Sequence, residues 1–204
     1  MIPARHTPFH TAFFRFYSQY LMRKAFRSLT FVDDPGPTDK AVLIIGNHFS
    51  WYDGFFMNYY NSKVLRKKFH VMMLEEQLRG RMFLNKAGAY SIKPGTRDII
   101  ESLRYSSQIL ADPGNIVLMY PTGEIQSSYM SSFVFMKGLD RILEGNDPEI
   151  RFYVCMIDYF SDRKPSAWIY FRLAPDDCRD TPTLEKAYNE FYRNCIPRQN
   201  EKRK

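Results

Sequence analysis

The sequence predicts an α/β fold: a single domain with a mixed, largely parallel sheet flanked by helices, preceded by an N-terminal amphipathic helix. Short uninterrupted apolar runs alternate with segments of helical periodicity, a pattern typical of strands buried on both faces. The chain has 204 residues, 45% of them hydrophobic, which suits one core. Polar, reactive residues follow two of the apolar runs directly, where sites lie in open α/β sheets.

The first segment, residues 1–32, contains a predicted basic amphipathic helix over Phe9–Leu29. Aromatic residues recur at helical spacing on one stripe, and basic residues recur on another. Such a helix either lies on a membrane surface or buries its aromatic side chains against its own domain. The loop at 33–39, with two prolines and a glycine, ends this segment. The aromatic stripe comprises Phe9, Phe13, Phe16, Tyr17 and Tyr20, and the basic stripe comprises Arg15, Arg23 and Arg27 with Gln19 between them.

The α/β domain is predicted over 40–196. Its apolar runs predict strands at 41–45, 69–74, 115–120, 150–157 and 167–173. Helices are predicted to begin near Ser50, Glu75, Thr96 and Thr181, and the second of them is expected to continue to Gly88. The remaining residues, 197–204, are expected to form a frayed tail.

The net charge of +7 favours a partner with negative charge. No helix-turn-helix, RNA-recognition or zinc pattern is visible, so nucleic acid is not expected as a partner. Aromatic residues stand beside basic residues in the first thirty positions, which favours an anionic membrane surface.

The cysteines and the apolar runs indicate the expected compartment and whether a metal site is expected. The three cysteines are far apart and show no metal-ligand spacing, so neither a disulfide framework nor a zinc site is indicated. The longest apolar run is AVLII, far short of the ~20 residues that span a bilayer, and the N-terminus lacks the order of a signal peptide. We therefore expect a peripheral protein at the cytoplasmic face of the membrane.

The stretch GNHFSWYD places His48 just after the first predicted strand, with Asp53 five residues further on. A histidine can act as a general base when a carboxylate fixes its tautomer and stabilises its charged form. The alternative is a buried histidine bonded to the backbone. The stretch YPTGEIQSS at 120–128 also follows a predicted strand directly, so both loops should face one crevice.

These blocks resemble the glycerophosphate and lysophosphatidic acid acyltransferases, whose hallmark is Asn-His-x-x-x-x-Asp after a strand. GAYSIKPGTRD at 88–98 is similar to the family's Gly-x-x-x-Ile-x-Arg block, and YPTGEIQSS is similar to its Phe-Pro-Glu-Gly-Thr-Arg-Ser block. MKGLDRIL at 136–143 resembles the Lys-Gly segment that follows. The resemblance covers roughly residues 40–160 and keeps the order and spacing of all blocks.

The resemblance implies a fatty acyl transfer in membrane lipid biosynthesis. His48 would remove the proton from the hydroxyl of a lysolipid acceptor, and Asp53 would steady the imidazole. The acceptor would be 1-acylglycerol-3-phosphate, and the acyl thioester donor would be acyl-CoA or acyl-carrier protein, a co-substrate. No metal and no other cofactor is implied. Backbone N–H groups around Gly123 or at a helix start could stabilise the oxyanion.

The substrate-binding residues depart from the family pattern. Thr122 stands where the family has glutamate, with Glu124 two positions later, and Pro94 stands at the family's phosphate-binding arginine, leaving Lys93 and Arg97 as the nearest cations. A lyso-aminolipid acceptor without phosphate is therefore one alternative, and a non-catalytic lipid-binding module of the same fold is another. The predicted substrate-binding residues are Gly123, Glu124, Thr122, Lys93, Arg97 and Lys137.

Overall fold

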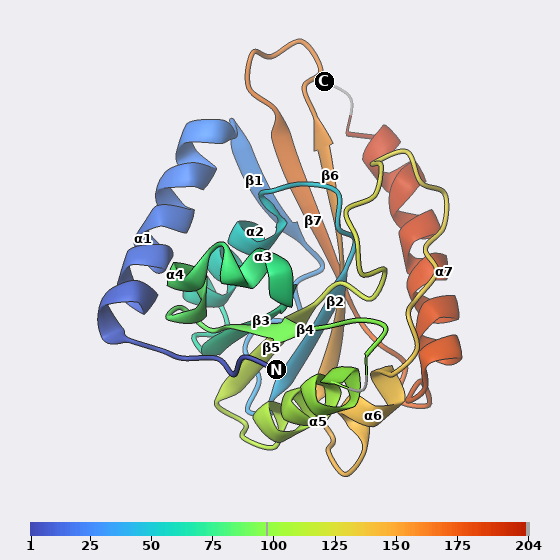
Figure 1. Cartoon of the computed structure of the whole chain (residues 1–204). Helices are drawn as coiled ribbons and strands as arrows, with labels where there is room; N and C mark the ends of the chain where they lie inside the picture. Colours follow the sequence, from blue (N-terminus) through green and yellow to red (C-terminus); the bar gives the residue numbers. More distant parts are fainter. Residues whose placement is uncertain (97, 203–204) are drawn as a thin grey trace.

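A seven-stranded sheet lies between two layers of helices in the computed structural model, which describes residues 1–96 and 98–202 (Figure 1). The strands are β1 Ser28–Val32, β2 Val42–Gly46, β3 Lys68–Leu74, β4 Ala89–Ile92, β5 Asn115–Met119, β6 Glu149–Asp158 and β7 Ser166–Leu173. The helices are α1 Pro8–Ala25, α2 Asp53–Lys63, α3 Glu75–Arg79, α4 Met82–Asn85, α5 Asp98–Leu110, α6 Leu139–Leu143 and α7 Thr181–Asn200. The strand order is β1-β7-β6-β2-β5-β3-β4.

The sheet is mixed and largely parallel, as the sequence predicts. Neighbouring strands are parallel except β6 and β7, which are antiparallel. Parallel strands need helical crossovers that cover both faces of the sheet. The carboxyl ends of β2, β5, β3 and β4 therefore lie on the same side of the sheet, and the loops that follow these strands meet there.

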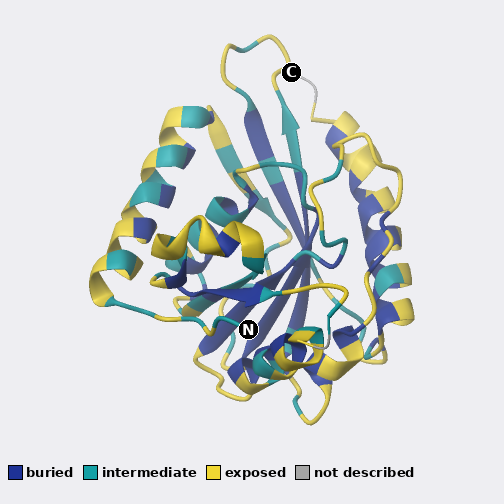
Figure 2. Cartoon of the chain, viewed as in Figure 1, coloured by how far each residue is buried: buried dark blue, intermediate teal, exposed yellow. Residues whose placement is uncertain are grey.

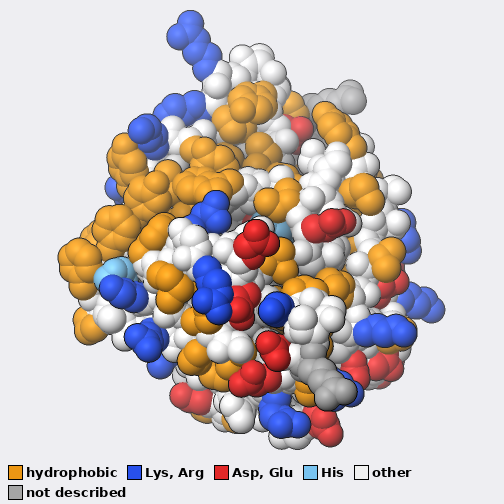
Figure 3. Space-filling view, viewed as in Figure 1, with side chains coloured by type: hydrophobic (Ala, Val, Ile, Leu, Met, Phe, Trp, Pro, Cys, Tyr) orange, Lys and Arg blue, Asp and Glu red, His pale blue; other side chains and the backbone are white. Residues whose placement is uncertain are grey.

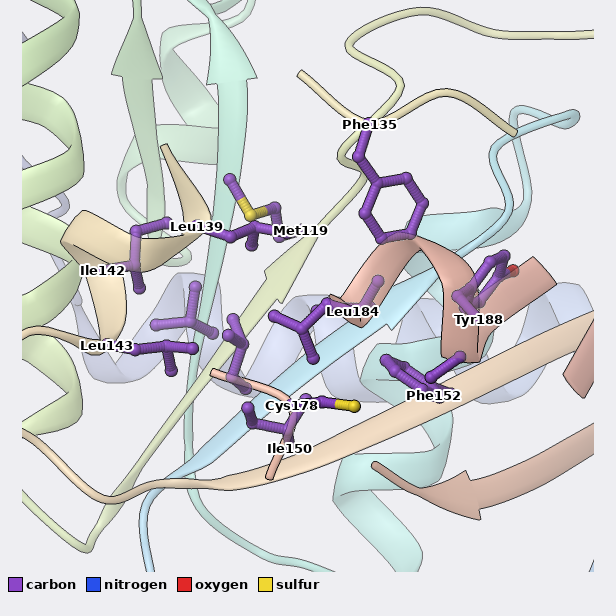
Figure 4. Close-up of a cluster of buried hydrophobic side chains, with 14 of the residues drawn as sticks. Met119, Phe135, Leu139, Ile142, Leu143, Ile150, Phe152, Cys178, Leu184 and Tyr188 are labelled. Carbon is purple, nitrogen blue, oxygen red and sulfur yellow. The ribbon is translucent and has the colours of Figure 1, made fainter. Parts of the chain in front are cut away.

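The strands β2 and β5, in the middle of the sheet, are almost entirely apolar because both faces of the sheet are buried there (Figure 2). In β2, Leu43 and Ile45 face the core that α5, α6 and α7 cover, whereas Val42 and Ile44 face the core that α2 and the end of α1 cover. Figure 4 shows part of the first core, where Met119 of β5 and Leu184 of α7 lie among the labelled side chains. The alternation fixes which face each side chain of β2 occupies.

The N-terminal helix is shorter than predicted. Thr7 caps its start, Pro8 occupies the first turn, and the helix ends at Ala25. Residues 28–29, which the periodicity places in the helix, and residues 30–32 of the same N-terminal segment form β1, an edge strand that pairs with β7. Because β1 is half-exposed, its sequence SLTFV lacks the continuous apolar run that marks the central strands. This segment therefore belongs to the sheet.

Two further element predictions are wrong. The helix predicted from Glu75 to Gly88 is two short helices, α3 and α4, and the edge strand β4 follows at Ala89. The frayed tail predicted from Pro197 continues α7 to Asn200. Gln199 is buried, its side-chain oxygen accepts a hydrogen bond from the Tyr170 hydroxyl at 2.8 Å, and its amide donates to Asp158. These bonds tie the end of α7 to β6 and β7.

Candidate active site

Gly46, the last residue of β2, and Asn47, which follows it, fix the backbone that carries His48. The side chain of Asn47 bonds to both backbone groups of Cys155 on β6, donating to its carbonyl at 3.1 Å and accepting from its N–H at 3.0 Å. Gly46 lies against the ring of Tyr153, which a Cβ at position 46 would meet at 2.0 Å. His48 therefore follows a strand end that has little freedom to move.

His48 and Asp53 form a pair at the start of α2. Nδ1 of His48 lies 2.8 Å from Oδ2 of Asp53, and the same oxygen accepts the backbone N–H groups of Phe49 and Ser50 at 2.8 and 2.9 Å. The Asp53 side chain is fully buried, whereas that of His48 is 24% exposed. Burial raises the pKa of Asp53 above its ordinary value, and the hydrogen bonds from His48, Ser50 and Phe49 oppose this rise.

The tautomer of His48 follows from this geometry. Asp53 accepts from Nδ1, so the neutral imidazole carries its proton there and Nε2 is a free acceptor. No hydrogen-bond partner of Nε2 is found among residues 1–96 and 98–202. The pair therefore has the form of a base and its orienting carboxylate.

The loop after β5 contacts His48 directly. The ring of Tyr120 stacks on the imidazole with centroids 4.1 Å apart and planes 14° from parallel. The backbone N–H of Gln126 donates to the His48 carbonyl at 2.7 Å. The loops after β2 and β5, predicted to face one crevice, are thus in contact.

Tyr120 is held in turn by Tyr153 of β6, whose hydroxyl donates to the Tyr120 hydroxyl at 3.2 Å. Burial raises the pKa of both phenols well above the ordinary value, so both are neutral at physiological pH. Sequence reasoning missed both residues and the Gln126 bond. Only the position of Tyr120 after a predicted strand gave a signal, because a stacking partner is set by tertiary proximity.

Three of the predicted substrate-binding residues, Thr122, Gly123 and Glu124, belong to the loop after β5 that contacts His48. Gly123 has φ 74°, and its N–H donates to the Tyr120 carbonyl at 3.0 Å, so this N–H closes a turn and is not free for an oxyanion. The Thr122 hydroxyl donates to the Glu124 carbonyl at 3.1 Å within the same loop. Glu124 is exposed and lies three residues after Pro121.

The predicted cations are not anchored to the pair. Lys93, after β4, and Lys137, before α6, are both exposed. In the described part of the chain, no hydrogen bond or ion pair joins either ammonium to His48 or Asp53. Arg97 lies outside the described residues.

The described residues contain no group of three or more His, Cys, Asp or Glu side chains placed to hold a metal ion. Within the same ranges, no helix is both long and apolar enough to cross a membrane.

Comparisons with known proteins point to one family. The family model described as Acyltransferase matches residues 28–151, which is more than half of the chain. A search of curated proteins finds no match. Among solved structures, the chain is similar to the crystal structure of the 1-acyl-sn-glycerophosphate (LPA) acyltransferase PlsC from Thermotoga maritima, with a TM-score of 0.65 and 13% identity over 95% of this chain and 81% of that chain.

Proposed function

Because the chain belongs to the Acyltransferase family, we propose that it moves a fatty acyl chain from a thioester donor to the hydroxyl of a lysolipid. The observation that carries this proposal is the His48 imidazole, oriented through Nδ1 by a buried carboxylate and open at Nε2. A base held in this way can serve an acceptor hydroxyl without a nucleophilic serine or cysteine.

The proposed reaction has two steps. Nε2 of His48 takes the proton of the acceptor hydroxyl as its oxygen attacks the thioester carbonyl, and a tetrahedral oxyanion forms. The intermediate then expels the thiolate, which receives the proton from the imidazolium, so an ester and a free thiol leave. Asp53 stabilises the imidazolium between the steps. The reaction requires no metal and no redox cofactor.

The proposed acceptor is 1-acylglycerol-3-phosphate, and the donor is acyl-CoA or acyl-carrier protein. Support for this acceptor is the fold shared with a protein described as an LPA acyltransferase. A lyso-aminolipid is the second candidate. In this chain, Pro94 and Thr122 stand where the glycerophosphate and lysophosphatidic acid acyltransferases have a phosphate-binding arginine and a glutamate. Lys93 and Lys137, both exposed, are the cations in the described residues proposed to meet the phosphate of the first acceptor.

The proposed place of work is the cytoplasmic face of a membrane, reached through α1. Its exposed aromatic face comprises Phe9, Phe13, Phe16 and Tyr20, which are 48 to 74% exposed, whereas Phe14 is buried. Hydrophobic side chains gather along the edge of the molecule where α1 lies (Figure 3). Aromatic side chains flanked by arginines suit the interface of an anionic bilayer.

A panel assay tests the function. The wild type and His48→Ala would each receive lysophosphatidic acid or a lyso-aminolipid, with acyl-CoA or acyl-carrier protein as the donor, while thiol release and product lipid are measured. We expect thioester-dependent acylation by the wild type and at least about a thousandfold loss in the variant. Preference for the lyso-aminolipid would replace the proposed acceptor, and equal, near-zero rates in both proteins would support the non-catalytic lipid-binding module.

A further inference from the structure

A cavity of about 470 Å³ lies between α1 and α2, away from His48. Its lining comes from the first half of α1, the second half of α2, the turn after α2 and the first residues of β3, together with His6 and Ala87. The two helices pack against each other (Figure 1). Because β3 and β2 are both parallel to β5, their amino ends lie on the same side of the sheet. The start of β3 therefore lies at the opposite end of the strands from the end of β2. The cavity is therefore separate from the His48–Asp53 site.

The lining of this cavity is strongly basic. Four cationic residues contribute to it, namely Arg15, Arg66, Lys67 and Lys68, and no Asp or Glu does. Across the described ranges, none of the four forms an ion pair with a carboxylate, and the Lys67 ammonium donates to the neutral carbonyl of Pro113. The positive charge that surrounds the cavity is uncompensated.

The turn that presents these cations is fixed by α2. Asn61 accepts the Lys67 N–H through its side-chain oxygen at 3.0 Å and donates to the Lys67 carbonyl at 2.8 Å. Arg66 has φ 55°, and its N–H donates to the Asn61 carbonyl at 2.7 Å. Glycine is the residue that this left-handed conformation favours, yet an arginine occupies it. The chain thus tolerates strain at the one position of the turn where a side chain is least favourable.

We propose that this cavity binds a phosphate group, carried by a phospholipid headgroup or by a soluble phosphate ester. Arginine and lysine side chains without acidic neighbours are the usual partners of phosphate, and the hydroxyls of Thr11 and Ser62 add neutral donors to the lining. The cavity volume of about 470 Å³ leaves room for a group larger than a carboxylate, such as a phosphate. Arg15 also lies on α1, the helix with the exposed aromatic face, so a helix resting on a bilayer would carry the cavity near the headgroup layer.

Two charge-matched double variants test the site in the full chain. Arg66→Gln with Lys68→Gln removes two cations from the cavity, and Arg163→Gln with Lys164→Gln removes two exposed cations from the turn between β6 and β7. Backbone amide NMR signals would be followed during titration with inorganic phosphate or glycerol 3-phosphate, with sodium chloride at equal ionic strength as the reference. Co-sedimentation would use phosphatidylcholine vesicles with and without phosphatidylglycerol.

We expect soluble phosphate to shift the amide signals of 61–68 in the wild type and the control variant, with at least about tenfold weaker binding in the cavity variant. If only vesicles with phosphatidylglycerol respond, the headgroup is the source of the phosphate. Vesicle binding should then fall about 25-fold in the cavity variant, at about fivefold per cation, and clearly less in the control. Equal losses in both variants, or no response to either probe, would overturn the proposal. His48→Ala should bind like the wild type, which separates this result from the proposed acyl transfer.

Discussion

At the scale of single residues, the site rests on a spacing that the sequence reveals and on contacts that it does not. A histidine and an aspartate five residues apart, directly after a strand, predict the contact between Nδ1 of His48 and Asp53, which the structure contains. The stack of Tyr120 on His48 joins loops 72 residues apart in the chain, since 120 − 48 = 72. No local pattern encodes such a pair.

Tyr120 is expected to position the imidazole through its ring rather than through its hydroxyl. Tyr120→Leu removes the stacked face, and kcat should fall about two- to tenfold with little change in KM, because such stacks contribute about 0.5–1.5 kcal/mol. Tyr120→Phe keeps the ring and should retain most of kcat. Steady-state kinetics of both variants check this, and equal losses would assign the effect to the hydroxyl bonded to Tyr153.

Asp53 is expected to lower the free energy of unfolding at neutral pH, although turnover depends on it. The pKa of Asp53 is raised in the folded state. The stability that its protonated form supplies is therefore present below the ordinary aspartate pKa and is lost as pH rises through the raised value. In the Asp53→Asn variant the side chain does not titrate, so this loss of stability does not occur. The difference in free energy of unfolding, variant minus wild type, should therefore increase with pH.

Urea unfolding at several pH values from 4 to 8 measures this difference, and acyl transfer by the same proteins should fall by about three orders of magnitude. A difference that decreases as pH rises would contradict the assignment.

At the scale of elements, the central strands and the longer helices could be predicted, and the edges of the sheet could not. β2 and β5 are buried on both faces, so their sequences are continuous apolar runs. β1 and β4 lie at the two edges of the sheet: β1 is partly exposed, and β4 is buried but has only four residues, one of them a serine, so neither forms such a run. Pro197 at the predicted start of the tail was misleading, because contacts of Gln199 outweigh the helix-breaking tendency of proline.

The end of α7 is expected to contribute to stability through Gln199. Gln199→Ala leaves the buried Tyr170 hydroxyl without its acceptor, and the free energy of unfolding should fall by about 1–3 kcal/mol. Asn194→Ala, at an exposed position of the same helix, should change it by less than about 0.5 kcal/mol. Denaturant unfolding compares the two, and equal small effects would mean that the end of α7 frays.

At the scale of the whole molecule, His70 should make the fold sensitive to acid. Burial, together with the nearby His6 and Lys68, lowers the pKa of His70 from 6.5 to about 3, while the Asn115 side chain and, more weakly, Asp112 oppose this. Between these values the unfolded chain binds a proton that the folded chain excludes. Stability is therefore lost as pH falls from about 6.5 toward 3, by up to about 1.4 kcal/mol per pH unit.

His70→Leu removes this group, so its free energy of unfolding should depend less steeply on pH between 6.5 and 4 than that of the wild type. Chemical unfolding at fixed temperature across this range gives both slopes. Parallel slopes would show that other groups dominate the acid response.

The pairing of β1 with β7 has a consequence for how the chain is made. On the ribosome, residues 28–32 emerge long before residues 166–173, the strand with which they pair in the described part of the sheet. β2 likewise waits for β5 and β6. The nascent chain must therefore carry unpaired β-forming segments until residues 166–173 have been made, a period in which assistance from chaperones would matter more than for a protein whose strands pair in order.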